Sequence, residues 1–304
     1  MYKCDTYINL NDDVKIPTIG FGTFQLEGSD AGEAVFNAIE LGYRHIDTAS
    51  VYQNEEAVGA GIKKGLARTG AQRHELFVTT KLWPGYSAWG ETVKSYSETM
   101  AAFNESLDRL ELDYIDLYLI HSPHGGTERL SQWRALLEIK NSGKVRSIGV
   151  SNYSIKHIEE IKNAGLPLPE VNQIELHPWS QKTELVSYLR NNNITPIAYS
   201  SLAPLSTWRN KPGETSAKTS EMSIDDGVFF NLAKKYHVTE AQFLLRWAIQ
   251  QGYAVLPKSL NPTRMRQNLD LFGFNIDQND MDLIQTMDRG HGIAWNIGDP
   301  SLID

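Results

Sequence analysis

The feature that most constrains the fold is an eightfold alternation of short apolar segments with longer amphipathic ones. The short segments are rich in β-branched and aromatic residues, as strands are, and the longer ones carry apolar residues at helical spacing. Strands that alternate with helices form parallel sheets, and in a chain of 304 residues we expect closure into an α/β (β/α)8 TIM barrel. The predicted strands cover residues 16–22, 44–47, 76–81, 114–120, 145–150, 171–175, 194–199 and 253–257. The predicted helices cover residues 30–41, 54–67, 93–110, 128–142, 154–163, 182–192 and 223–250, with another after residue 262.

Three segments lie outside this alternation. Near the N-terminus, Asn11, Asp12 and Asp13 stand between two short alternating runs, which predicts a β-hairpin ahead of the barrel. Residues 200–222 and 289–304 match neither pattern, and long loops of this kind often cover functional sites. Since no linker divides the chain, we expect residues 1–304 to form a single barrel domain with an N-terminal hairpin and extra helices and loops.

The composition argues against several classes of protein. The 37 acidic and 29 basic residues give a net charge of −8, which disfavours non-specific binding to nucleic acid. No apolar run approaches the ~20 residues of a membrane helix, and the first residues lack the apolar core of a secretion signal. The one cysteine, Cys4, cannot form an internal disulfide and fits a reducing compartment. We therefore expect a cytoplasmic protein that binds neither membrane nor nucleic acid.

Four polar side chains stand at or just after the carboxyl ends of strand-like runs: Asp47, Tyr52, Lys81 and His121. Carboxyl ends of neighbouring parallel strands meet at one end of a sheet, so these groups are expected to form an acid–base site. A nearby ammonium favours phenolate, so Lys81 is expected to lower the pKa of Tyr52 from its ordinary ~10. Asp47 would keep Lys81 charged and in place. Such a group suits protonation of a carbonyl oxygen, although each residue alone also has a purely structural explanation.

A metal site formed by histidines is a weaker interpretation of the sequence. His121 and His124 lie three residues apart, but Ser122 and Pro123 between them prevent a helical pair and no third ligand follows, so no metal site is predicted. His177 is better explained as structural.

A Rossmann-type glycine fingerprint is also absent, because Gly20 and Gly22 lack a third glycine and a following helix. Gly59, Gly61 and Gly65 lie inside a helical pattern, where close helix packing explains them. A dinucleotide would therefore bind without a Rossmann unit.

In order and spacing, the chain resembles the aldo-keto reductases through the segments GFGTF, YRHIDTASVYQNEEAVG, VTTKLW, YIDLYLIHSP, GKVRSIGVSNY, VNQIELHPW, IAYSSLA and VLPKSLNPTRMRQN. The resemblance extends from about residue 8 to about residue 288. It implies a monomeric or weakly associated barrel that binds NADP(H) in extended form and reduces carbonyls. It also implies that Tyr52 is the general acid, that Lys81 and Asp47 tune it, and that His121 orients the substrate carbonyl. A phenol and an imidazole donor would stabilise the charge that develops on the carbonyl oxygen.

The resemblance assigns further residues to the nicotinamide end of NADP(H). Ser151, Asn152 and Gln173 resemble the set that binds the carboxamide, since a hydroxyl and two amides offer both donors and acceptors. Tyr199 resembles the aromatic ring that stacks on the nicotinamide. The other residues expected at this end and along the pyrophosphate are Thr23, Ser200 and Leu202.

The adenosine end is expected near a helix that follows the eighth strand. Asn261 and Pro262 read as its N-cap and first residue, which places Arg264 in the first turn beside backbone amides that favour anions. With Lys258 and Ser259, Arg264 suits the 2′-phosphate of NADP. Asn268 resembles the adenine contact, whereas Gln267 stands where many relatives have glutamate, which weakens the adenine contacts and the preference for NADP.

The substrate pocket is expected to include Phe24, Trp83, Ser122 and Trp295, with Trp89 and Trp208 as further candidates. Phe24 and Ser122 depart from residues common in relatives and would reshape the pocket. The predicted function is NADPH-dependent reduction of aldehydes and ketones to alcohols, and His121, where enone reductases have glutamate, favours carbonyl over C=C reduction. The alternative is a redox-sensing regulatory subunit that holds NADP(H) and acts through a protein partner.

Overall fold

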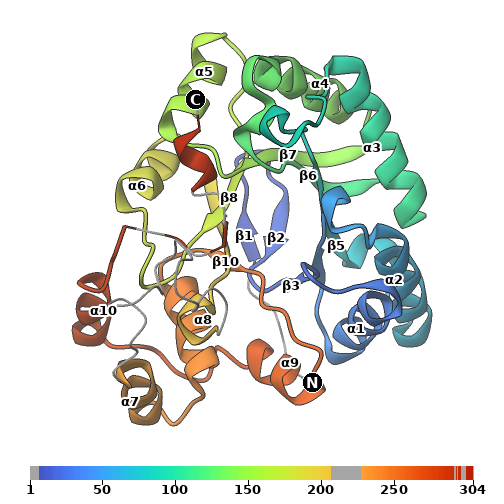
Figure 1. The fold of residues 1–304 in the computed structure, drawn as a ribbon. Coiled ribbons are helices and arrows are strands. Elements are labelled where there is room, and N and C mark those ends of the chain that lie inside the picture. Colours follow the sequence, from blue (N-terminus) through green and yellow to red (C-terminus); the bar gives the residue numbers. More distant parts are fainter. Residues whose placement is uncertain (1–6, 207–226, 291, 293, 296–298, 304) are drawn as a thin grey trace.

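The architecture is a closed barrel of parallel strands surrounded by helices (Figure 1). The computed structural model describes residues 7–206, 227–290, 292, 294, 295 and 299–303. Its main sheet has the order β10-β9-β8-β7-β6-β5-β4-β3, and a parallel bridge between Ile19 and Val255 joins the two edges. These strands are β3 (Phe21–Gly22), β4 (His45–Asp47), β5 (Phe77–Leu82), β6 (Ile115–Ile120), β7 (Val145–Ser151), β8 (Val171–Glu175), β9 (Thr195–Tyr199) and β10 (Ala254–Val255). The predicted (β/α)8 barrel is confirmed.

Helices surround the sheet on its outer side, as Figure 1 shows. Their apolar faces pack against the outward-facing strand residues and bury large side chains such as Phe103, Trp133 and Trp247. The helices are α1 (Gly28–Leu41), α2 (Glu55–Thr69), α3 (Tyr96–Leu110), α4 (Arg129–Asn141), α5 (Ile155–Asn163), α6 (Thr183–Asn191), α7 (Val228–Lys235), α8 (Glu240–Gln250), α9 (Pro262–Leu269) and α10 (Gln278–Gln285). The short 3-10 helices are η1 (Ser50–Tyr52), η2 (Arg73–Glu75), η3 (Ser87–Trp89), η4 (Pro123–Glu128), η5 (Ala203–Leu205) and η6 (Pro300–Leu302).

The glycines of α2 allow close helix packing. A Cβ at Gly61 would lie 2.4 Å from the carbonyl oxygen of Gly32, and one at Gly59 would lie 2.4 Å from that of Leu110. Both distances are too short for a side chain, so α2 can approach its neighbours only with glycine at these positions. The structure therefore confirms the packing role predicted for these glycines.

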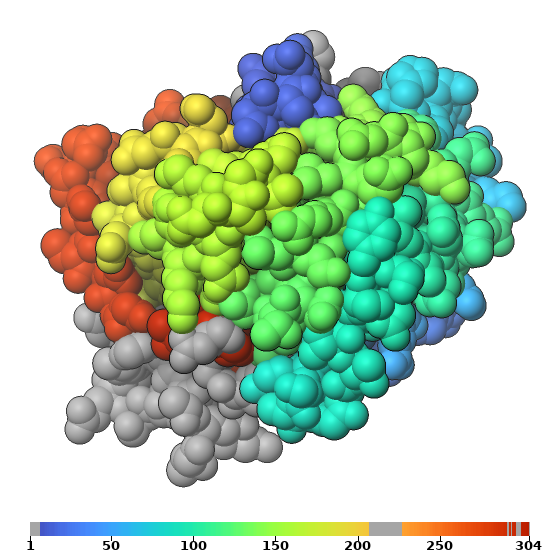
Figure 2. All heavy atoms as spheres, turned by 90° about the horizontal axis from the view of Figure 1, so that it is seen from above, coloured from blue at the N-terminus to red at the C-terminus, as the bar shows by residue number. Residues whose placement is uncertain are grey.

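A hairpin fills the amino-terminal end of the barrel. Strand β1 (Tyr7–Asn9) pairs antiparallel with β2 (Lys15–Pro17), and Asp13 turns the chain with a left-handed φ of 65°. Leu10 and Ile16 are buried in one cluster with Phe77 and Leu117, which come from β5 and β6. In Figure 2 the hairpin, coloured dark blue, lies at one end of the molecule. The predicted N-terminal hairpin is confirmed, and it forms an apolar plug.

The prediction of one continuous strand over residues 16–22 is wrong. Residues 15–17 belong to the hairpin and residues 21–22 form β3, so the chain changes pairing partner between them. Pro17 has no N–H to donate, which favours an interruption of strand pairing at this point.

The prediction of one helix over residues 223–250 is also wrong, since α7 and α8 are separate helices and residues 223–226 lie outside the described residues. His237 interrupts the helical backbone with a φ of 57°. Thr239 then begins α8 through a capping box with Gln242. Within the described part of the chain, no helix has the length and apolar character that crossing a bilayer requires.

Candidate functional site

A cavity of about 520 Å³ opens at the carboxyl ends of the barrel strands. Asp47 ends β4, Ser151 ends β7 and Tyr199 ends β9, and all three line it because parallel strands finish at the same end of the barrel. The predicted site residues that line the cavity are Thr23, Phe24, Asp47, Tyr52, Trp83, His121, Ser151, Asn152, Gln173, Tyr199, Ser200, Leu202, Lys258 and Trp295. Most residues of the predicted site are thus brought to one place.

Lys81 lies fully buried below the cavity, and its charge is met by a fixed set of acceptors. Its Nζ donates to Oδ1 of Asp47 at 2.5 Å and to the carbonyl oxygen of Thr48 at 2.8 Å. The second carboxylate oxygen of Asp47 accepts a hydrogen bond from Nε2 of Gln173 at 2.8 Å. Lys81 Nζ also lies 5.1 Å from the centroid of the Tyr52 ring. A buried ammonium is therefore fixed beside a phenol.

The pKa of Tyr52 is raised, which corrects the expectation that it is lowered. Burial raises the pKa of the phenol more strongly than the Lys81 ammonium lowers it, and Asp47 adds a smaller upward effect. Lys81 does act in the expected direction, but desolvation outweighs it. Burial lowers the pKa of Lys81, but the electrostatic and hydrogen-bond interactions with Asp47 and Tyr52 outweigh it and the net shift is upward. At neutral pH the site therefore holds a protonated phenol and a charged ammonium.

His121 follows β6 and faces Tyr52, with an edge-to-face ring contact at a centroid distance of 5.5 Å. Burial lowers the pKa of its imidazole well below 6.5, and the charges of Lys81 and His124 lower it further. The imidazole is therefore neutral at pH 7 and can donate a hydrogen bond from only one ring nitrogen.

The residues predicted to bind a carboxamide form a connected hydrogen-bond network. Nδ2 of Asn152 donates to the carbonyl oxygen of His121 at 2.9 Å and to Oγ of Ser151 at 3.0 Å. The Ser151 hydroxyl donates to the carbonyl oxygen of Gln173 at 2.8 Å, and the Tyr199 hydroxyl donates to Oδ1 of Asn152 at 2.5 Å. Asn152 adopts a left-handed φ of 62°, a conformation that asparagine tolerates better than most residues. This network holds the predicted nicotinamide residues in one orientation.

The residues predicted at the phosphate lie in the connection from β10 to α9 and in the first turn of α9. Lys258 lines the cavity, whereas Ser259, Arg264 and Asn268 do not. The side chain of Asn261 caps α9 and accepts from the backbone N–H of Arg264 at 3.1 Å, which confirms the predicted helix start. Arg264 is exposed in the first turn and Asn268 is buried. Arg264 therefore stands at the helix start, outside the cavity lining, whereas Lys258 belongs to that lining.

Aromatic side chains form the outer part of the cavity. Phe24, Trp83 and Trp295, which were predicted in the substrate pocket, line the cavity, and so does Trp89, which stacks on Trp83 at a centroid distance of 5.8 Å. Phe24 and Trp89 are 47% and 49% exposed, so they lie at the mouth. Trp208, a further candidate, lies outside the described residues.

Ser122 does not line the cavity, contrary to its predicted place in the substrate pocket. It is fully buried, and its Oγ is 2.6 Å from Nδ1 of His124. The His124 ring packs against Tyr86 and Trp295 at centroid distances of 4.1 and 5.8 Å. Ser122 therefore acts on the pocket only indirectly, through the position of the His124 ring.

Several residues that line the cavity were not marked as site residues by any pattern in the sequence. They are Gln25, Val51, Ser201, Ala203, Ser206, Leu256, Pro257 and Ala294. Leu256 and Pro257 directly follow β10, so their place at a strand end was the usable signal. Ala294 reaches the site through contacts distant in sequence, which no local pattern indicates. Across the described residues, no group of three or more His, Cys, Asp or Glu side chains could hold a metal ion.

The chain matches known proteins over nearly its full length. The Aldo/keto reductase family model matches residues 18–289. The chain is 39% identical to Glyoxal reductase of Bacillus subtilis (strain 168) over 95% of each chain, and 34% identical to Methylglyoxal reductase DkgA of Escherichia coli (strain K12) over 94% of each. Among solved structures, it is similar to the Bombyx mori aldo-keto reductase in complex with NADP, with a TM-score of 0.84, 35% identity and 95% coverage of both chains.

Proposed function

The chain belongs to the aldo/keto reductase family, and from that premise we propose that it reduces aldehydes and ketones to alcohols with NADPH, using Tyr52 as the general acid. The observation that carries this proposal is the phenol of Tyr52 at the cavity wall, with the buried Lys81 Nζ 5.1 Å from the centroid of its ring. Two relatives named for the reduction of glyoxal and methylglyoxal support a carbonyl substrate.

The described residues fit a nicotinamide dinucleotide phosphate. The lining of the cavity includes Trp295, Tyr52 and Tyr199 as well as Lys258, so aromatic rings and a cation border the same space. When bound, NADPH would supply the hydride. Under this proposal, the residues that hold it are Thr23, Ser151, Asn152, Gln173, Tyr199, Ser200, Leu202, Lys258, Ser259, Arg264 and Asn268.

The acid–base groups then have distinct roles. Tyr52 transfers its phenolic proton to the carbonyl oxygen as negative charge develops there, and the neutral imidazole of His121 donates a hydrogen bond to the same oxygen. The phenolate that remains is stabilised by the Lys81 ammonium. Asp47 keeps that ammonium charged and oriented through its 2.5 Å hydrogen bond.

The test is NADPH oxidation by the purified protein with glyoxal, methylglyoxal and a neutral aromatic aldehyde. Tyr52→Phe should lower turnover by about 10² to 10⁴ and leave NADPH affinity unchanged, as expected when a positioned acid is removed. Tyr96→Phe, which removes a hydroxyl from an exposed tyrosine, is the matched control and should have no effect. Binding of NADPH without turnover of any of these carbonyls would contradict the proposal and favour a regulatory NADP(H)-binding subunit.

The phosphate assignment has its own test. Arg264→Ala should weaken NADPH binding by about tenfold to a hundredfold, the value of a hydrogen bond to a charged group, and change NADH binding little. Arg266→Ala, in the last turn of the same helix, is the control. Equal losses for NADPH and NADH, measured by fluorescence titration, would show that Arg264 does not contact the 2′-phosphate.

A further inference from the structure

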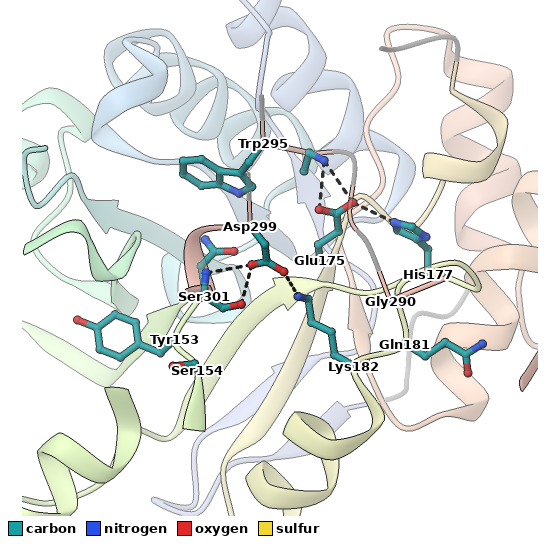
Figure 3. Close-up of polar contacts among 12 residues, drawn as sticks. Tyr153, Ser154, Glu175, His177, Gln181, Lys182, Gly290, Trp295, Asp299 and Ser301 are labelled. Atoms are coloured by element: carbon teal, nitrogen blue, oxygen red, sulfur yellow. Dashed lines mark hydrogen bonds and ion pairs between the residues drawn. The ribbon is translucent and has the colours of Figure 1, made fainter. Parts of the chain in front are cut away.

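The C-terminal segment, defined here as residues 288–290, 292, 294, 295 and 299–303, lies across the carboxyl end of β8 and the connection to α6 (Figure 3). Figure 3 shows the side chains of Glu175 and Lys182 directed toward it, with Trp295 on the far side of the same segment. Ala294 and Trp295 line the cavity. Contacts that fix this segment therefore bear on the shape of the site.

Glu175 holds the segment through its backbone. The N–H of Ala294 donates to both carboxylate oxygens of Glu175, at 3.2 Å to Oε1 and 3.1 Å to Oε2. Glu175 is itself only 4% exposed, and Nε2 of His177 lies 2.9 Å from its Oε1. A Cβ on Gly292 would lie 2.2 Å from Glu175 Oε2, so the segment passes close over the carboxylate. The carboxylate is thus enclosed between a histidine and a backbone amide.

Two further contacts fasten the segment beyond this point. Lys182 forms an ion pair with Asp299, and Asp299 also accepts hydrogen bonds from the backbone N–H and the hydroxyl of Ser301 at 2.9 and 2.7 Å. Nε2 of His157, on α5, lies 2.7 Å from the carbonyl oxygen of Ile303. The segment is therefore held on both sides of Trp295.

Trp295 connects this segment to the predicted cofactor platform. Its indole Nε1 donates to the hydroxyl of Tyr199 at 2.9 Å, and that hydroxyl donates to Asn152. The Trp295 ring also packs near His121 and His124, at centroid distances of 6.3 and 5.8 Å. The orientation of one indole thus affects both the cavity wall and the tyrosine predicted to stack on nicotinamide.

We propose that Glu175 is a positioning residue for substrate recognition: by holding the Ala294 amide it sets Trp295 as a wall of the carbonyl pocket and as a hydrogen-bond donor to Tyr199. The inference rests on the proposed reductase function for its kinetic consequence. Glu175 itself does not line the cavity and acts through the segment it holds. Aldehydes with an aromatic group large enough to contact the indole should depend on Glu175, whereas glyoxal, which is too small to fill the outer pocket, should not.

The experiment compares Glu175→Ala with Glu175→Gln in the full-length protein with NADPH. Glutamine keeps one oxygen to accept from Ala294 and an amide group to face His177, so it should remain within about twofold of the unaltered protein. In Glu175→Ala, KM for a neutral aromatic aldehyde should rise by about tenfold, as when a pocket contact is lost. The kcat and the KM for glyoxal should change little, because Tyr199 keeps its hydrogen bond to Asn152 when the bond from Trp295 is lost. Unchanged KM for the aromatic aldehyde in Glu175→Ala would overturn the proposal, as would an equal loss in Glu175→Gln.

A second pair of variants leaves Glu175 in place. Gly292→Ala puts a methyl group against the carboxylate, whereas Gly273→Ala adds the same methyl group where no atom lies within 4 Å. The first should reproduce the rise in KM and the second should not. If Glu175→Ala fails to fold, the comparison of Gly292→Ala with Gly273→Ala still tests whether the contact with Glu175 positions Trp295.

A measurement that does not depend on catalysis separates the two proposals. Hydrogen–deuterium exchange of peptides from residues 288–303 should be faster in Glu175→Ala and Gly292→Ala than in Glu175→Gln and Gly273→Ala. Faster exchange in a protein without reductase activity would refute the proposed function but support the fastening by Glu175. If Glu175→Ala and Gly292→Ala leave the exchange unchanged in a protein that has reductase activity, the proposed role of Glu175 is refuted and the proposed function is not.

Discussion

The two ends of the barrel bury very different side chains. At the amino-terminal end, Leu10 and Ile16 of the hairpin region pack with Leu117 in an apolar cluster that needs no polar partner. At the carboxyl end, Asp47 and Lys81 are buried as charges, and each is held by specific hydrogen bonds. The hydrophobic effect stabilises the first arrangement, whereas the second is tolerated only because each charge has its partner. The same strands thus provide stability at one end and reactive groups at the other.

The largest expected effect comes from breaking the charged pair. Lys81→Met leaves the Asp47 carboxylate buried without its ammonium, which should lower the free energy of unfolding by about 3–5 kcal/mol. Turnover should fall by about 100-fold or more because the Tyr52 phenolate loses its stabilising charge. Urea denaturation and NADPH oxidation measure the two effects. Lys63→Met, at an exposed ion pair with Glu111, is the control and should change neither.

The apolar end should affect stability without affecting chemistry. Ile16 is fully buried in β2, so Ile16→Ala should lower the free energy of unfolding by about 2–5 kcal/mol through lost burial and a cavity. Turnover per folded molecule should stay unchanged, as measured under conditions where the variant is folded. A loss of turnover as large as that of Lys81→Met would show that the two ends are not separable.

His45 lies between the two ends and should give a smaller, pH-dependent effect. Burial lowers the pKa of its imidazole to about 4, against 6.5 in the unfolded chain. Between these values the unfolded chain binds a proton that the folded protein excludes. The contribution of the neutral His45 imidazole to the free energy of unfolding is therefore complete above pH ~6.5. It falls by about 3 kcal/mol as the pH drops toward 4. Urea denaturation at several pH values should show that the free energy of unfolding falls less with decreasing pH in His45→Gln than in the unaltered protein. Identical pH profiles for the two proteins would contradict this role of His45.

The sequence predicts the barrel well because the alternation of strand and helix has a direct physical cause. The prediction of individual strands and helices fails where two local patterns overlap. Residues 16–22 read as one apolar strand, but pairing with β1 captures residues 15–17. The apolar spacing of residues 223–250 hides the break at His237, although the Thr239 and Gln242 capping box was a readable signal.

For the candidate site, motifs at strand ends identify groups such as Tyr52 and Lys81, because sequence position and spatial position coincide there. The pKa of Tyr52 could not be predicted in the same way, since its direction depends on the degree of burial. The positioning role proposed for Glu175 was equally inaccessible, because its contact with Ala294 joins residues 119 positions apart. The properties of the site that the local sequence does not predict therefore depend on desolvation and on long-range contacts.

The hydrogen bond from Gln173 to Asp47 joins residues 126 positions apart, on strands that face each other across the barrel interior. Contacts so distant in sequence form slowly, because loop closure must precede them. A half-formed barrel containing β3 to β6 would hold Asp47, Tyr52, Lys81 and His121 but not the amide that orients the carboxylate. During refolding, the proposed reductase activity should therefore return with the last strands, later than most of the secondary structure.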